Sequence, residues 1–143
     1  MIARALGCAA LAAVTLGGCS SRAEDDVIRV EVQRLALAEG DAATTSAERV
    51  SGYGRRALPT IEAVIQTADA HGRKNLVLAL RRVGDGEAVP LLLHVAAWDT
   101  EPSVRTEAEW TLKTWAAAAD ARADKARAAL RRLDELKQRE EAG

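Results

Sequence analysis

The sequence predicts an all-α protein, and three observations carry this prediction. The 143 residues include 31 alanines, no phenylalanine and only four aromatic residues, whereas strands favour β-branched and aromatic side chains. After residue 26, apolar residues recur at spacings of three and four, as in amphipathic helices. Two stretches about 31 residues apart are similar to each other, which is typical of repeated helix pairs.

The first element, residues 1–18, is predicted to be a signal peptide. Arg4 precedes an uncharged apolar run over residues 5–16, and twelve helical residues cover about 18 Å, less than the ~30 Å hydrocarbon core of a bilayer. A basic start, a short apolar run and small residues form the secretory pattern. An ordinary secretory signal or a buried apolar helix is the alternative to the more specific interpretation that follows.

The last residues of this segment are Leu16, Gly17, Gly18 and Cys19. They resemble the lipobox of bacterial lipoproteins, which implies a diacylglycerol group on the Cys19 sulfur, cleavage after Gly18 and an N-acyl group on Cys19. Residues 19–26 would then be the lipidated cysteine and a polar tether. Cys8 would leave with the signal, so the mature chain would keep no free thiol. The resemblance implies the bacterial cell envelope, and Ser20 favours an outer-membrane location facing the periplasm.

Residues 27–140 are predicted to form one repeat domain, which opens with a degenerate helix pair. An apolar stripe over residues 27–38 predicts its first helix, although VIRVEV within this stretch also fits a short strand. Residues 45–48 fit a capping box, which predicts a short second helix ending near Gly52.

Two closer copies follow. Residues 57–59 (ALP) recur as residues 88–90 (AVP), and an apolar helical stripe follows each of them. The first copy is predicted as two helices over about residues 55–69 and 73–83, with Gly72 at the turn between them.

The second copy begins after the break at Gly84-Asp85-Gly86, where the Asp85 side chain is expected to cap the next helix. That helix is predicted to end near Trp98, before a turn over residues 99–102. Pro102 suits the first position of the following helix because the missing N–H needs no partner there. This second helix is predicted to end near Trp115, and Trp115 itself is expected in the core.

The last element, residues 120–140, is a predicted amphipathic helix. Its apolar positions are Ala123, Ala126, Leu130 and Leu133. Because one helix pair cannot bury its apolar face alone, stacked pairs share a core and atypical end elements cover it. We therefore expect this helix to close the stack.

The string from Ala79 to Trp115 resembles HEAT repeats, in particular the short bacterial HEAT-like kind named after PBS lyases. Its matching parts are the hinge ALRRVGD, the opening AVP and the turn DTEPSVR. The first copy matches in its first helix, but its turn at residues 69–73 lacks the proline and valine. The resemblance covers about residues 54–115 and implies a short right-handed α-solenoid of HEAT-like helix pairs, here with a C-terminal capping helix. It also implies that Asp99 and Arg105 support the turn and the neighbouring repeat.

No catalytic or metal site is expected. His71 and His94 have no cysteine or carboxylate at ligand spacing, and neither a G-x-S-x-G motif nor a phosphate-binding loop occurs. We therefore expect no enzyme activity, no small-molecule substrate and no cofactor besides the covalent lipid on Cys19. The net charge of −1 argues against nucleic-acid binding.

Five residues are candidates for partner contact. They are Arg73, Lys74, Arg81, Arg82 and Trp98. The four cations lie on a predicted helix without acidic residues, and in HEAT-like stacks the second helix of each pair lines the concave face. They could form a basic strip for an acidic partner or anionic lipid, or they could simply be a solvated helix face. Trp98 is the best anchor candidate among the three tryptophans because tryptophan is enriched in binding hot spots.

The predicted function is that of a membrane-anchored, non-catalytic interaction or scaffold module with an envelope protein as partner. Two alternatives stay open. The first is an enzyme-assisting or lyase-like subunit, since the family label includes subunits of bilin lyases, although fold does not carry function. The second is a purely structural envelope protein.

Overall fold

The computed structural model describes residues 17–143, with side chains from residue 21, and this part of the chain contains helices and no strand. The helices are α1 (Gly17–Ala36), α2 (Gly40–Ser51), α3 (Leu58–Ile65), α4 (Ala70–Val83), α5 (Val89–Trp98), α6 (Pro102–Ala116) and α7 (Arg122–Glu141). Short 3-10 turns, η1 (Gly54–Ala57) and η2 (Gly86–Ala88), lead into α3 and α5. The predicted all-α class is confirmed.

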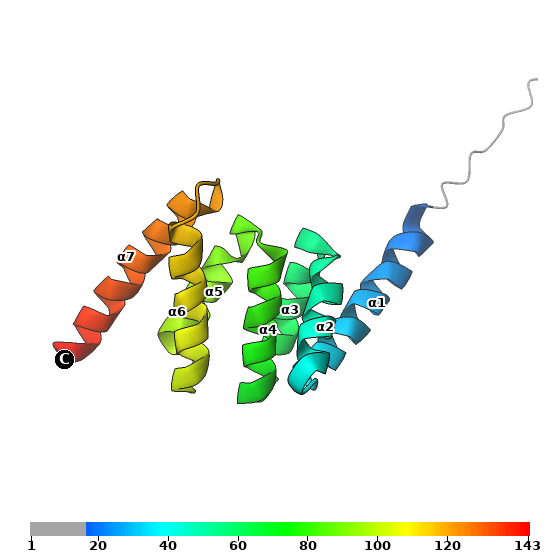
Figure 1. Ribbon diagram of the computed structural model, residues 1–143, viewed down its shortest axis with the longest axis horizontal. Helices are drawn as coiled ribbons and strands as arrows, with labels where there is room; N and C mark the ends of the chain where they lie inside the picture. The colour runs from blue at the N-terminus through cyan, green and yellow to red at the C-terminus, as the bar shows by residue number, and fades with distance from the viewer. Residues whose placement is uncertain (1–16) are drawn as a thin grey trace, which may run out of the picture.

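The helices pair in chain order: α1 with α2, α3 with α4, and α5 with α6. One layer consists of α2, α4 and α6, and the other of α1, α3, α5 and α7 (Figure 1). Within the first layer α4 packs against both α2 and α6, while α7 packs against both helices of the last pair. The described chain is therefore a short α-solenoid of three helix pairs with a closing helix, as the sequence predicts.

One continuous apolar core runs through the stack. Its largest fully buried side chains include Ile28, Leu35, Ile61, Leu76, Leu80, Leu92, Leu112 and Leu133. Every helix pair contributes to this list, and Leu133 comes from α7. Trp115 is also buried in this core, which confirms the expectation from its spacing. Buried alanines fill many of the remaining helix contacts, so the helices approach closely without large aromatic side chains.

The leading pair differs from its prediction in two respects. The helix predicted over residues 27–38 is confirmed, and the alternative short strand over residues 27–32 is not formed, but α1 reaches back to Gly17, so that residues 19–26, expected as a tether, lie within it. The α2 helix begins at Gly40, without a side-chain cap, so the expected capping box at residues 45–48 lies inside the helix. For α2 the physical reason is burial, because Ala43 near its start is covered, which favours helix beyond the local start signals. Residues 21–27 of α1 are exposed, so burial does not explain the extension of α1 toward Gly17.

The first copy also differs in detail. Its first helix, α3, is shorter than the expected 55–69, since residues 54–57 form the 3-10 turn η1. His71, expected in a turn, lies in the first turn of α4 with Nε2 2.8 Å from the carbonyl oxygen of Ala38.

The second copy matches its prediction closely. Oδ1 of Asp85 accepts a hydrogen bond from the backbone N–H of Glu87 at 2.8 Å, and Pro102 begins α6.

Gly72 lies inside α4 and not at a turn, so this prediction is wrong. Asp69 caps the helix instead, because its Oδ1 accepts a hydrogen bond from the N–H of Gly72 at 2.7 Å. A Cβ on Gly72 would lie 2.7 Å from the carbonyl oxygen of Ala36 at the end of α1. The glycine is therefore required for the close approach of α1 and α4.

Gly72→Ala is expected to lower the free energy of unfolding by about 1–3 kcal/mol, the usual range for overpacking. In an uncrowded helix the same change would stabilise by roughly 0.5–1 kcal/mol. Here the clash is with a backbone oxygen, which cannot rotate away, so α1 or α4 must shift. Urea denaturation followed by circular dichroism measures the difference. An unchanged or higher free energy of unfolding would contradict the close approach at Ala36.

Candidate interaction site

The turn after α5 is held by the carboxylate of Asp99. The Arg73 guanidinium donates from Nε to Oδ2 at 2.7 Å and from Nη2 to Oδ1 at 2.9 Å. The same carboxylate accepts a hydrogen bond from the N–H of Glu101 at 2.9 Å, and Arg105 donates to the carbonyl oxygen of Asp99 at 2.6 Å. Asp99 and Arg105 thus support the turn and link it to the preceding helix pair, as the resemblance implies.

Both groups of this ion pair are held in their charged forms. Burial raises the pKa of Asp99. The hydrogen bonds from Arg73 and from the N–H of Glu101 lower this pKa by more than burial raises it, so the pKa lies below its usual value. The hydrogen bond to Asp99 raises the pKa of Arg73. A general acid or base needs a pKa near the working pH, so this pair suits a structural role.

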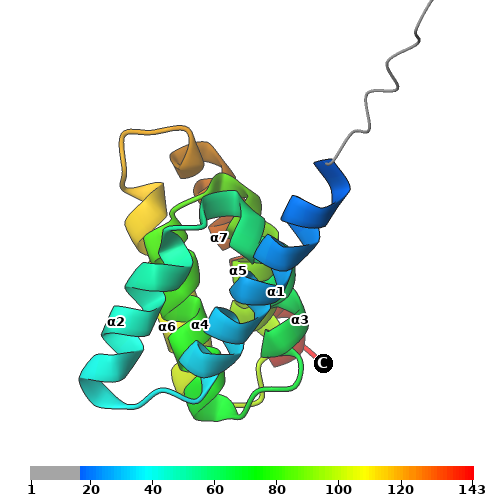
Figure 2. The same cartoon turned by 90° about the vertical axis from the view of Figure 1, so that its right-hand side faces the viewer.

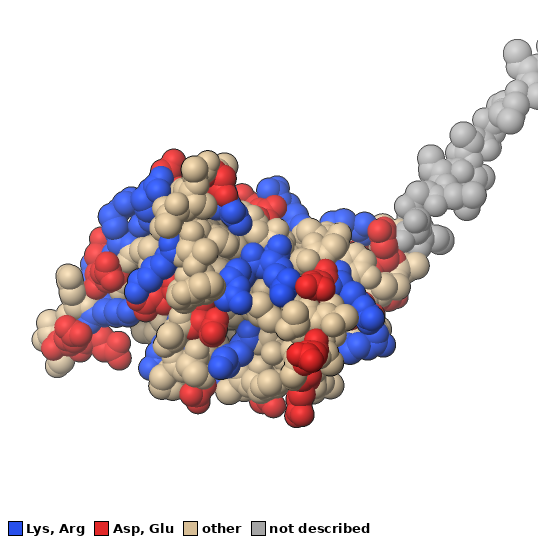
Figure 3. Space-filling model, in the orientation of Figure 1, with Lys and Arg blue, Asp and Glu red and all other residues tan. Residues whose placement is uncertain are grey.

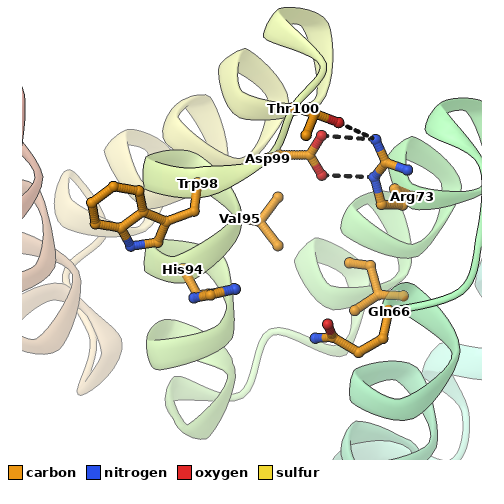
Figure 4. Close-up of a pocket in the computed structure, with 8 residues that line it drawn as sticks. Gln66, Arg73, His94, Val95, Trp98, Asp99 and Thr100 are labelled. Atoms are coloured by element: carbon orange, nitrogen blue, oxygen red, sulfur yellow. Dashed lines mark hydrogen bonds and ion pairs between the residues drawn. The ribbon is translucent and has the colours of Figure 1, made fainter.

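Trp98 is the last residue of α5, lies between two cavities and is 60% exposed. A cavity of about 190 Å³ is lined by Ile65, Gln66, Arg73, His94, Val95, Trp98, Asp99 and Thr100. Figure 4 shows the Arg73–Asp99 pair at one side of this cavity, with Trp98 and His94 at the other. A second cavity of about 220 Å³ lies between α5 and α7, and its lining includes Trp98, Ala97, Leu133 and Leu136. Trp98 therefore lines both cavities.

The four candidate cations do not form one free strip. Arg73 lies in the buried pair described above. Arg81 bonds to Glu107 of α6 at 3.3 Å and lies 4.6 Å from the ring centroid of Trp110. Arg82 bonds to Glu48 of α2 at 3.2 Å, and Lys74 is exposed. On the face of α2, α4 and α6, acidic side chains accordingly lie beside the basic ones (Figure 3).

The structure thus separates four of the five candidate residues into two regions, and Lys74 is exposed on α4. Arg73 and Trp98 line one cavity beside α5, whereas Arg81 and Arg82 extend along the layer of α2, α4 and α6. From the sequence, Glu107 and Glu109 in the second copy are expected to dilute the basic strip, but the pairing of Arg81 with Glu107, of Arg82 with Glu48 and of Arg73 with Asp99 was not predicted. One signal could have found them: Arg73–Asp99 and Arg81–Glu107 both join residues 26 apart, from one helix pair to the next.

The structure describes three of the four residues of the predicted lipobox. Gly17, Gly18 and Cys19 lie at the start of α1, and Leu16 is outside the described residues. Between residues 17 and 143, no cluster of three or more His, Cys, Asp or Glu side chains could hold a metal ion. Within the same range, no helix has the length and hydropathy to cross a membrane.

Comparison with known proteins identifies the repeat. A family model described as HEAT repeats matches residues 41–113, from α2 into α6, which is just over half of the chain. Neither a curated protein nor a solved structure was found to match. The matched range covers the pair α3–α4 and most of the pair α5–α6. The hinge motif lies at the end of α4, and the turn motif lies between α5 and α6. The chain belongs to the HEAT-repeat family.

Proposed function

We propose that this chain is a non-catalytic interaction module, held at a bacterial envelope membrane by lipid on Cys19, that binds an envelope protein around Trp98. HEAT repeats suggest a protein-interaction scaffold. The anchor is supported by the sequence Leu16-Gly17-Gly18-Cys19 directly after a short apolar run. Its proposed place is the periplasmic side of the outer membrane.

The observation that carries the proposal is the exposure of Trp98 between two cavities. A tryptophan at 60% exposure offers a large apolar surface at small conformational cost, and tryptophan is enriched among residues that dominate binding energy. Cavities on both sides could receive partner side chains. The Arg73–Asp99 pair fixes the adjoining turn, so the surface is organised before binding.

We expect a photo-crosslinking amino acid at position 98 to capture one discrete envelope protein in living cells. Against that protein in purified form, Trp98→Ala is expected to weaken binding about tenfold or more, since hot-spot truncations cost about 2 kcal/mol or more. Isothermal titration calorimetry with the lipidated full chain in detergent provides the measurement.

Trp110→Ala is the matched control. Trp110 is the other exposed tryptophan, but it lies on α6 under the guanidinium of Arg81 and lines neither of the two cavities at Trp98. Its replacement should leave the affinity nearly unchanged. Equal affinities of the Trp98→Ala variant and the wild type would contradict the proposed surface, and failure to capture any partner would favour a purely structural role.

A further inference from the structure

One side of α1 carries exposed apolar side chains. Two of them are on α1, namely Val27, which is 51% exposed, and Val30, which is 52% exposed. The third is Leu37, which follows the last residue of α1 and is 81% exposed. They make up three of the five large exposed apolar residues in the described part of the chain. The opposite side of α1 packs against α2, α3 and α4. In Figure 2, α1 and α2 form the end of the stack that faces the viewer.

Helix α1 connects Cys19 to this apolar surface. It is continuous from Gly17 to Ala36, so Cys19, Val27 and Val30 belong to one helix. An α-helix rises about 1.5 Å per residue, so the eleven positions from Cys19 to Val30 span about 17 Å. A lipid on Cys19 would therefore hold the apolar surface within a short distance of the bilayer.

The charges around this surface are paired. Arg34, in the middle of the surface, bonds to Glu31 at 2.8 Å, and at its edge Arg29 lies 3.2 Å from Asp26. The acidic residues Glu24 and Asp25 are held by Arg56 of η1, on another side of the helix. Little uncompensated negative charge therefore faces outward between Val27 and Leu37.

Arginines flank the end of the apolar surface. Leu37 borders a groove of about 540 Å³ between α1 and α2, whose lining includes Ala38, Ala42, Arg34 and Arg49. Long cationic side chains next to apolar ones suit the boundary between lipid tails and headgroups, where the stem stays in apolar surroundings and the charge reaches a phosphate.

We infer that this surface of α1, formed by Val27, Val30, Arg34 and Leu37, docks on the lipid surface beside the anchor. The inference rests on the proposed lipid at Cys19. The anchor keeps the surface at a high effective concentration next to the bilayer, so a weak intrinsic affinity is enough to orient the domain. In this orientation α5, α6 and α7 lie at the opposite end of the stack from the membrane (Figure 1), where Trp98 is open to a partner.

A second copy of the chain is the other candidate occupant, and the structure disfavours it. Stable protein interfaces bury about 1,200 Å² or more in total. Three large apolar side chains along one helix, with charged residues between and beside them, offer a narrow strip. A lipid surface requires only such a strip, because it adapts to the shape of the helix.

Site-directed spin labelling tests the inference. Val30→Cys and Leu37→Cys, each with a nitroxide label, are placed in the lipidated full chain on vesicles of phosphatidylethanolamine with a minority of phosphatidylglycerol. Ala128→Cys, at an exposed position of α7, is the matched control. On vesicles we expect both α1 labels to lose collisions with a water-soluble nickel chelate and gain collisions with oxygen, each several-fold. The label at position 128 should not change.

The outcomes separate the docked surface from the anchor. One outcome is that the protein co-floats with vesicles while the labels at positions 30 and 37 stay exposed to water. This would overturn the docked surface and would still be consistent with the lipid anchor. A wild-type protein that fails to co-float, like a Cys19→Ser variant, would overturn the anchor and the inference with it. Protection of the labels without vesicles that increases with protein concentration would identify a second copy as the occupant and also overturn the inference.

Discussion

Leu80→Ala is expected to lower the free energy of unfolding by about 3–4 kcal/mol, within the range of about 2–5 kcal/mol for buried leucines. The Leu80 side chain is fully buried in α4, and α4 packs against α1, α2, α3 and α6. With neighbours on several sides, the structure cannot collapse into the space that the missing methyl groups leave. The cavity term therefore adds to the lost transfer free energy. Since small domains are stable by only about 5–15 kcal/mol, this change removes a large share.

Leu37→Ala provides the control for the same chemical change at the surface. Leu37 is 81% exposed, so in the absence of membranes its replacement should change the free energy of unfolding by no more than about 0.5 kcal/mol. Urea denaturation of both variants, monitored by circular dichroism, gives the comparison. Equal, small effects at the two leucines would contradict the position of α4 at the centre of the stack.

Local signals predicted the second copy of the repeat well. Asp85 caps the 3-10 turn before α5, Pro102 begins α6, and Gly84 ends α4 with a φ of 65°, a left-handed conformation that favours glycine. Each of these signals acts within a few residues along the chain. Such signals can be recognised from sequence without knowing which helix packs against which.

The features that sequence analysis missed depend on distant residues. A glycine beside polar residues indicates a turn, but Gly72 is required by the carbonyl oxygen of Ala36, which belongs to another helix pair. The start of α2 is likewise decided by burial and not by a cap. No local pattern distinguishes these cases, because the steric contact exists only after the helices have packed.

The same reason limits what the sequence says about the candidate site. The helix that carries Arg81 and Arg82 has no acidic residue of its own and therefore predicts a basic strip. In the structure, Glu48 and Glu107 reach these cations from the helices on either side. The charge of this face is thus set by tertiary pairing. The exposure of Trp98, in contrast, follows from its position as the last residue of the short helix α5.

Asp99→Ala is expected to lower the free energy of unfolding by about 2–3 kcal/mol. The carboxylate is almost fully buried and accepts hydrogen bonds from Arg73 and from the N–H of Glu101. Its removal leaves a largely buried guanidinium with only part of its partners, and an unpaired buried charge is strongly destabilising. Asp124→Ala is the matched control, because Asp124 forms a similarly short ion pair with Arg127, and the Asp124 side chain is 91% exposed. Exposed pairs of this kind contribute about 0–1 kcal/mol.

The pH dependence of this difference separates charge from packing. The pKa of Asp99 is lower in the folded protein than in the unfolded chain, where it is about 3.9. A lowered folded-state pKa stabilises the protein fully above the unfolded value, and this contribution disappears as the pH falls through the folded value. The stability gap between wild type and Asp99→Ala should therefore stay constant near neutral pH and shrink below about pH 4. A gap of the same size well below that pH would show that Asp99 stabilises the turn by packing and not by its charge.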